Sequence, residues 1–97
     1  MNYIENVPEV GAGSLVLDQN FPNPFTGRTT IPFTLPNASD VTFFVMDALG
    51  HIVFTEHGYF AAGNNSITLD MDQYTTGVYY YGIEVDGVRQ MRKMIVR

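Results

Sequence analysis

The stretch Val41-Thr42-Phe43-Phe44-Val45-Met46-Asp47-Ala48-Leu49-Gly50 carries the clearest structural signal in this chain of 97 residues. Val41, Phe43 and Val45 alternate along it, which is the pattern of a strand with one side in a core. Asp47 suits the first position of a tight turn, and Gly50 supplies the positive φ that ends a type I turn with a bulge. Residues 51–57 would then return beside the first strand, so the stretch predicts an antiparallel hairpin.

Similar short apolar runs lie on both sides of this hairpin. They cover residues 15–17, 29–35, 65–71, 77–85 and 88–96, and turn signals separate them. Residues 58–63 are expected to form a loop or an irregular edge, and Asp86-Gly87 predicts a two-residue I′ turn. About seven strands without a helical period indicate an all-β fold, an immunoglobulin-like antiparallel β-sandwich.

Two of these strands carry further expectations. In residues 77–85, one face gathers Tyr79, Tyr81, Ile83 and Val85, whose rings would pack in the core while a hydroxyl ties a neighbouring loop. In residues 29–35, Pro32 lacks the N–H that a strand ladder needs. That strand should therefore lie at an edge, or turn the N–H side of Pro32 to solvent.

The segment Phe21-Pro22-Asn23-Pro24-Phe25 fixes its own backbone shape. Each proline locks φ and removes a donor, and Pro24 also keeps Asn23 out of the helical region. We expect a stiff extended corner at the start of the β-domain, with a phenylalanine ring at each end that is able to dock into the core.

Length and composition favour one domain with a short tail. Residues 1–14 end in Gly11-Ala12-Gly13-Ser14 and are expected to be a flexible linker, so that the sandwich comprises residues 15–97. The absence of cysteine excludes disulfides and thiolate metal sites. The N-terminus lacks the basic and apolar regions of a signal peptide, and no run is long enough to span a membrane.

Charge is distributed unevenly along the chain. The net charge is −5, yet residues 89–97 hold four of the five basic residues, Arg89, Arg92, Lys93 and Arg97. Residues 1–88 therefore carry a net charge of −9, and the last nine residues carry +4. An acidic body argues against nucleic-acid binding. The basic end either pairs with neighbouring carboxylates or is offered to a partner.

Residues suited to catalysis or metal binding are scattered. His51 and His57 would lie about 20 Å apart on one strand, too far to share a metal ion. Asp70-Met71-Asp72 resembles the start of a calcium loop, but the rest of that motif does not follow. The sequence predicts no enzyme, no metal and no cofactor.

One apolar set does not fit the core face of the central hairpin. With Phe43 and Val45 inward, Phe44 and Met46 point outward, and Ile52 and Phe54 join them if Val53 points inward. Such a patch is typical of an interface with a partner or with a second copy of the chain, as in a homodimer. The alternative is an asymmetric sandwich that buries these side chains.

The order of these features, from about Leu17 to Arg97, resembles the type A C-terminal sorting domain of cargo proteins of the bacterial type IX secretion system. The resemblance rests on Leu17-Asp18-Gln19-Asn20-Phe21-Pro22-Asn23-Pro24-Phe25, Thr30-Ile31-Pro32-Phe33, Val45-Met46-Asp47-Ala48-Leu49-Gly50, Ala62-Gly63-Asn64, Gly77-Val78-Tyr79-Tyr80-Tyr81 and Lys93-Met94-Ile95-Val96-Arg97.

The resemblance implies a small β-sandwich at the end of exported proteins of Bacteroidetes-type bacteria. The outer-membrane machinery would read it after periplasmic transit, and a sortase-like protease would cut upstream, releasing the cargo or attaching it to lipopolysaccharide. Recognition would fall on Lys93, Met94, Ile95, Val96 and Arg97, with Lys93 and Arg97 as charged marks. The structural signature would be Pro22, Asn23, Pro24, Phe25, Asp47, Gly50, Gly77 and Tyr79. Phe44, Ile52, Phe54 and Tyr74 depart from the residue types that are usual in the family.

Two other functions remain open. A carbohydrate-binding accessory module could stack sugars on Tyr59, Phe60, Tyr79, Tyr80 and Tyr81, although alternation places Tyr79 and Tyr81 in the core. A purely structural spacer would have no use for its basic end.

Overall fold

The computed structural model describes residues 14–97. The tail expected over residues 1–14 lies outside this range, apart from Ser14. The described chain forms seven strands, namely β1 (Val16–Leu17), β2 (Arg28–Leu35), β3 (Ser39–Asp47), β4 (Ile52–Phe60), β5 (Gly63–Asp70), β6 (Gly77–Val85) and β7 (Val88–Val96). It contains no helix, and so none long and apolar enough to cross a membrane. The all-β prediction is confirmed.

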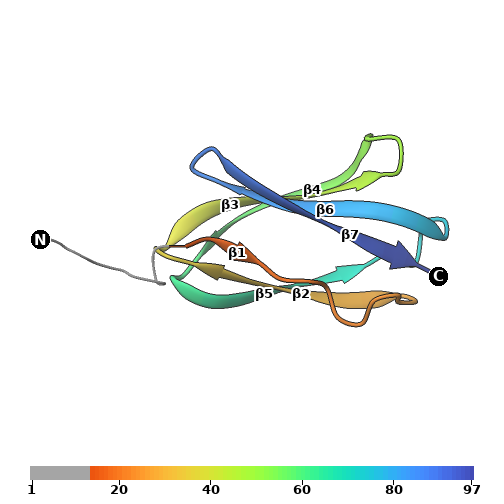
Figure 1. The fold of residues 1–97 in the computed structure, drawn as a ribbon, viewed down its shortest axis with the longest axis horizontal. Coiled ribbons are helices and arrows are strands. Elements are labelled where there is room, and N and C mark those ends of the chain that lie inside the picture. The colour runs from red at the N-terminus through yellow and green to blue at the C-terminus, as the bar shows by residue number, and fades with distance from the viewer. Residues whose placement is uncertain (1–13) are drawn as a thin grey trace, which may run out of the picture.

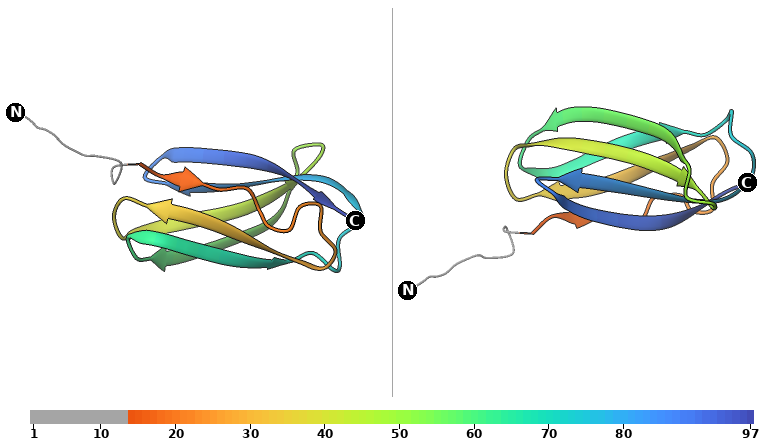
Figure 2. Two further views of the ribbon diagram at one scale, coloured as in Figure 1. Left: turned by 60° about the horizontal axis from the view of Figure 1, so that its bottom comes forward. Right: turned by 90° about the horizontal axis from the view of Figure 1, so that it is seen from above.

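The strands form two antiparallel sheets that face each other (Figures 1 and 2). One sheet has the order β1-β2-β5, and the other has the order β4-β3-β6-β7. This is the order of strands A-B-E and C′-C-F-G in immunoglobulin-like sandwiches. The predicted fold is therefore confirmed in both architecture and connectivity.

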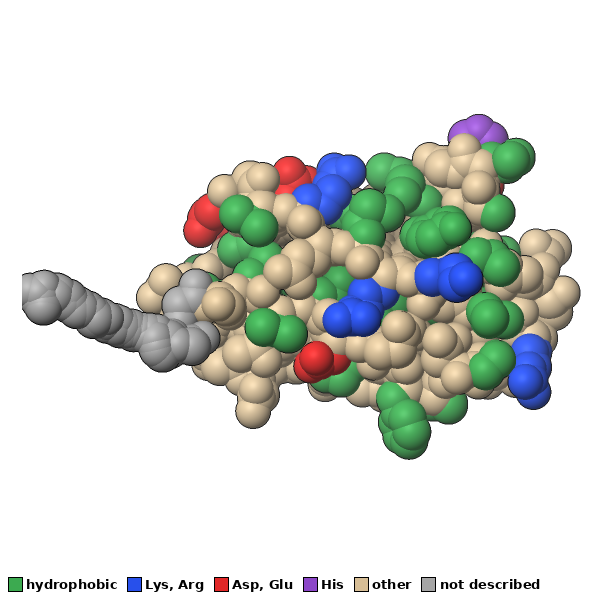
Figure 3. Space-filling model, viewed as in Figure 1, with side chains coloured by type: hydrophobic (Ala, Val, Ile, Leu, Met, Phe, Trp, Pro, Cys, Tyr) green, Lys and Arg blue, Asp and Glu red, His purple; other side chains and the backbone are tan. Residues whose placement is uncertain are grey.

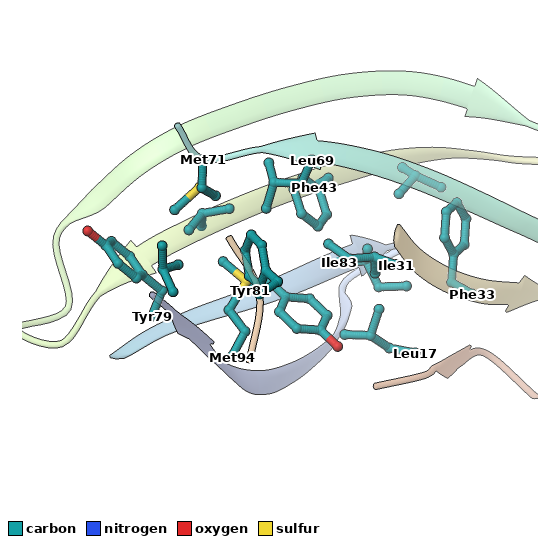
Figure 4. Close-up of a cluster of buried hydrophobic side chains, with 14 of the residues drawn as sticks. Leu17, Ile31, Phe33, Phe43, Leu69, Met71, Tyr79, Tyr81, Ile83 and Met94 are labelled. Carbon is teal, nitrogen blue, oxygen red and sulfur yellow. The ribbon is translucent and has the colours of Figure 1, made fainter. Parts of the chain in front are cut away.

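Side chains of alternate residues fill the space between the sheets (Figure 4). The core includes the predicted inward faces of β2, β3, β5 and β6, among them Ile31, Phe33, Val41, Phe43, Val45, Leu69, Tyr79, Tyr81, Ile83 and Val85. The rings of Phe43 and Tyr81 lie 6.4 Å apart between centroids. Each large apolar side chain buried here contributes roughly 1.5–3 kcal/mol.

The turn predicted after β3 forms as expected. Gly50 has a φ of +89°, and its N–H donates to the Asp47 carbonyl at 3.0 Å. The Asp47 carboxylate accepts the N–H groups of Leu49 and His51, each at 2.9 Å. These donors, that of His51 above all, lower the pKa of Asp47. Asp86 and Gly87 both have positive φ, as a I′ turn requires.

Pro32 lies in a central strand, so the edge strand, one of the two alternatives predicted for it, is wrong. β2 pairs with β5 along its whole length and with the short β1 at Thr34 and Phe33. Beyond that pairing, Asp18 N–H donates to the Pro32 carbonyl at 3.0 Å, and Pro32 has no N–H to return. The Asp18 carbonyl instead accepts the Tyr81 hydroxyl at 2.7 Å. A side chain of the opposite sheet thus replaces the missing donor.

The loop expected over residues 58–63 is shorter than predicted. β4 continues to Phe60, and β5 begins at Gly63. The Phe60 ring packs edge-on against Phe33, with 5.1 Å between centroids. This contact across the sheets keeps the end of β4 extended, which local sequence does not reveal.

Candidate docking site on the last strand

Of the five predicted recognition residues on and after β7, two are buried in the core and three are exposed to solvent. Met94 and Val96 face Tyr79 and Gly77 across the pairing with β6 and are buried, with 0% and 4% of their surface exposed. Lys93, Ile95 and Arg97 are exposed. In the folded domain, only these last three side chains are available to a partner.

The basic residues of the described chain also differ in their partners. Arg28 pairs with Asp70 at 3.5 Å, and Arg89 pairs with Glu84 at 3.4 Å. Arg92 donates from Nε to the Leu17 carbonyl at 2.6 Å. Within residues 14–97, Lys93 and Arg97 form no ion pair and donate no side-chain hydrogen bond. The unpaired positive charge therefore gathers at the end of β7.

The outer edge of β7 is closed at this end by the corner over residues 21–25. Phe25 N–H donates to the Ile95 carbonyl at 3.1 Å, and Arg97 N–H donates to the Phe25 carbonyl at 2.8 Å. Ile95 N–H donates to Asn23 Oδ1 at 2.9 Å. Another strand could pair with this part of β7 only after displacing the corner.

The corner also joins the two sheets. Phe21 forms a bridge to Thr30 on β2, and Phe25 forms a bridge to Val96 on β7. Both X–Pro peptide bonds within it are cis. The stiff corner predicted from the prolines thus connects β2 of one sheet with β7 of the other.

A buried polar cluster holds the start of the corner. The Tyr81 hydroxyl accepts the N–H of Asn20 at 2.7 Å, and its position beside β1 is visible in Figure 4. The Asn20 side chain donates to Pro22 O at 3.1 Å and to Thr29 Oγ1 at 3.0 Å. Burial raises the pKa of Tyr81 to about 12, because the phenolate is poorly solvated there.

The two rings of the corner differ in exposure. Phe25 is buried in the core as predicted, but Phe21 is 75% exposed. Phe21 pairs with Thr30, whose neighbours Thr29 and Ile31 point inward. Because paired residues share a face of a sheet, Phe21 must point outward. Of the two rings that could dock into the core, only Phe25 does so.

Comparison with known protein families gives a match that covers most of the chain. The model of the secretion system C-terminal sorting domain matches residues 19–97, from the start of the corner to the end of β7. The chain belongs to this family. Among curated proteins, none matches the chain.

Membership of the family gives the sorting domain its context. It is a C-terminal signal for type IX secretion, which implies an attached N-terminal cargo, recognition by the secretion machinery, and export to the cell surface or the medium. Domains of this family are not catalytic. The described residues contain no group of three or more side chains that could hold a metal ion.

The residues predicted as the structural signature occupy turns and the core. Gly77 begins β6 with a φ of +149°, and the Tyr79 hydroxyl donates to the Thr75 carbonyl at 2.8 Å. This bond ties the β5–β6 connection to β6, as a tyrosine corner does in related sandwiches. The hydroxyl predicted to secure a loop is thus present on Tyr79.

The apolar patch of the sorting domain differs from the prediction at Phe54. The register shifts between Val45 and Met46, so that Val45 pairs with Phe54 and Met46 pairs with Ile52. Phe54 therefore points inward and packs against Phe43, with 6.2 Å between centroids. Simple alternation from Ile52 predicts that Phe54 points outward, and the bulge turns it inward instead.

The other predicted patch residues point outward. Ile52 is 59% exposed and Met46 is half-buried, whereas Phe44 is 3% exposed because Arg89 lies 4.8 Å above its ring. Val78, Tyr80, Met91 and Ile95 belong to the same face and are absent from the predicted patch. The inward alternation of Tyr79 and Tyr81 would have located Val78 and Tyr80.

The five aromatic side chains considered for sugar binding do not form a platform for sugar rings. Tyr79 and Tyr81 are buried, and Phe60 packs on Phe33. Tyr59 and Tyr80 are exposed, but they pair with Asp40 and Met46, six residues apart on β3. That separation is about 20 Å. The arrangement does not favour the carbohydrate-binding alternative.

Proposed function

We propose that this sorting domain is read through the solvent-facing side chains of β7, and that Lys93, Ile95 and Arg97 carry the recognition. The observation that supports this most is the charge distribution. Lys93 and Arg97 are the basic residues that neither form an ion pair nor donate a side-chain hydrogen bond within residues 14–97, whereas Arg92 donates to the Leu17 carbonyl; the net charge of the chain is −5.

The chemistry expected of the receptor follows from this surface. A carboxylate-bearing groove would attract Lys93 and Arg97, while the acidic remainder of the domain would be repelled. Such complementarity orients an encounter and raises its rate more than it raises affinity. Because the corner closes the adjacent edge of β7, the first contact is made by side chains rather than by strand addition.

After recognition, the cargo would cross the outer membrane from the periplasm. A sortase-like protease would cut within or before residues 1–14, and the cargo would be released or attached to lipopolysaccharide. The sorting domain itself would act without a cofactor and without catalysis.

A reporter fusion tests this function. Residues 15–97 are attached to the C-terminus of a fluorescent protein that carries a signal peptide, in a host with type IX secretion. The double variant Lys93→Glu plus Arg97→Glu should keep the reporter in the periplasm, whereas the parent exports it. Arg28→Glu reverses the charge of one basic side chain on the three-stranded sheet and is the charge-matched control for each single variant, Lys93→Glu or Arg97→Glu.

Substitution is a sharper test than deletion of residues 93–97. Deletion would also remove Met94 and Val96 from the core and the backbone bonds to the corner. Loss of export could then reflect unfolding. Normal export of the folded double variant would contradict the proposed recognition.

A further inference from the structure

The four-stranded sheet has an outer face built from aligned rows of residues. In one row Ile52 pairs with Met46, Met46 with Tyr80, and Tyr80 with Lys93. In the next row Phe44 pairs with Gly82, and Gly82 pairs with Met91. Val78 and Ile95 form a further pair. Since paired residues share a face, these side chains form one surface, which we call the outer apolar face.

The outer apolar face is open to solvent over most of its residues. Ile52 is 59% exposed, Met91 40%, Val78 37%, and Tyr80 and Ile95 36% each. Figure 3 shows hydrophobic side chains gathered over the region where β4 and β6 run, with Lys and Arg side chains beside them. An apolar cluster of this kind on a small domain marks an interaction surface.

Close packing flattens the middle of this face. A Cβ atom at Gly82 would lie 2.5 Å from Phe44 Cζ and 2.7 Å from the Gln90 carbonyl. Glycine is therefore needed for the Phe44 ring to lie against β6 beneath Arg89. The Phe44 ring is therefore covered rather than projecting to solvent, with the Arg89 guanidinium above it.

The other sheet shows that the fold does not require such a surface. The outward residues of β2 and β5 include Thr30, Thr34, Asn64, Ser66 and Thr68. Exposed apolar residues are confined to its margin, at Val16 and Phe21. Both sheets present one face to solvent, so the difference between them points to a function of the outer apolar face.

The charges on and around the outer apolar face indicate which charge a partner should carry. The residues that define the outer apolar face include no carboxylate. Further along the same side of the sheet, Glu84 is paired with Arg89, and Asp40 lies at the far end of β3. Lys93, which lies beside Tyr80, has no ion pair within residues 14–97. A second copy would bring the same positive rim, whereas a different protein with a carboxylate opposite Lys93 would be complementary.

We propose that the outer apolar face docks onto a protein of the export machinery whose contact surface is apolar and bears a carboxylate opposite Lys93. This inference rests on the proposed function and extends it. Recognition then involves β3, β4 and β6 as well as the last strand. It also assigns a role to Ile52 and Tyr80, which lie far from the C-terminus in sequence.

The test uses residues that are well exposed and lie outside the last five positions. In the same reporter fusion, Ile52→Glu plus Met91→Glu should reduce exported fluorescence at least ten-fold. Ser66→Glu plus Thr68→Glu adds the same charge to the outer face of the three-stranded sheet and should export like the parent. Thermal melts of the purified domains must show that both double variants remain folded.

Three other results would each have a distinct meaning. Normal export of folded Ile52→Glu plus Met91→Glu, with export still lost in Lys93→Glu plus Arg97→Glu, would overturn this inference and leave the proposed function standing. Failure of the parent fusion to export would overturn both. A parent dimer in sedimentation analysis that Ile52→Glu plus Met91→Glu dissociates without affecting export would show that the face binds a second copy, and would also overturn the inference.

Discussion

Removing one hydroxyl, by Tyr81→Phe, should destabilise the domain strongly because that group joins the two sheets. The Tyr81 ring is 0% exposed, and its hydroxyl accepts the Asn20 N–H and donates to the Asp18 carbonyl, each at 2.7 Å. The substitution leaves the ring in place, so that no large cavity forms. The loss is therefore confined to two hydrogen bonds.

The magnitude follows from the burial of the groups left behind. Asn20 is 3% exposed, so its N–H would lose its acceptor without gaining water. A buried unsatisfied donor costs about 1–3 kcal/mol, and the second bond contributes about 1 kcal/mol. The sum, about 2–4 kcal/mol, corresponds to a fall in Tm of roughly 10–20 °C for a domain of this size.

Thermal unfolding followed by near-ultraviolet circular dichroism measures this change. Tyr80→Phe is the matched control, because Tyr80 lies next in the strand and its hydroxyl makes no hydrogen bond within residues 14–97. It should shift the free energy of unfolding by less than about 0.5 kcal/mol. If Tyr81→Phe melted within 2 °C of Tyr80→Phe, the argument that this hydroxyl ties the sheets would be refuted.

Four further predictions concern pH, packing and the corner. The pKa of Tyr81 rises from 10.0 to about 12 on folding, so the stability contributed by the protonated hydroxyl is complete below pH 10 and is lost as pH rises through 12. Denaturant unfolding across this range should show that the difference in unfolding free energy between the parent and Tyr81→Phe shrinks, and a constant difference would contradict this prediction. Gly82→Ala should lower the free energy of unfolding in urea by about 1–3 kcal/mol, since the added methyl group would clash with Phe44 and the Gln90 carbonyl. An unchanged unfolding midpoint would show that the neighbouring atoms can move aside at little cost. In the same assay, Met94→Ala should lower the free energy of unfolding by about 2–5 kcal/mol, while Lys93→Ala should change it by less than about 0.5 kcal/mol. Equal effects of the two substitutions would contradict the assignment of Met94 to the core face of β7. Asn23→Ala removes the acceptor of the Ile95 N–H and should weaken the contact between the corner and the β7 edge by about 0.5–1.5 kcal/mol. Hydrogen exchange at the Ile95 amide should then become faster, and an unchanged exchange rate would contradict this prediction.

Local pattern was sufficient to predict most of the fold. Alternation assigned the inward faces of β2, β3, β5 and β6 correctly, because a strand directs successive side chains to opposite sides whatever its partners are. The turns at Gly50 and at Asp86-Gly87 were also predictable, since few residues tolerate positive φ. Lys93 and Arg97 stood out from charge alone.

The errors at Phe54 and Pro32 have a common origin in strand pairing. A bulge opposite Val45 and Met46 turns Phe54 inward, and periodicity within β4 contains no sign of that extra residue. Pro32 is tolerated in a central strand because the Tyr81 hydroxyl, from the other sheet, binds the Asp18 carbonyl. The first effect depends on the register of β4 against β3, and the second depends on a side chain of the opposite sheet.

Sequence by itself determined that this protein is a small β-sandwich with a stiff corner and a basic last strand. Tertiary structure alone decided which basic residues are left unpaired, which edge is closed and how far the outer apolar face extends beyond the central hairpin. The physical reason is distance along the chain. The contacts that settle these questions join Asn23 to Ile95 and Leu17 to Arg92, 72 and 75 residues apart, and no local propensity encodes such pairings.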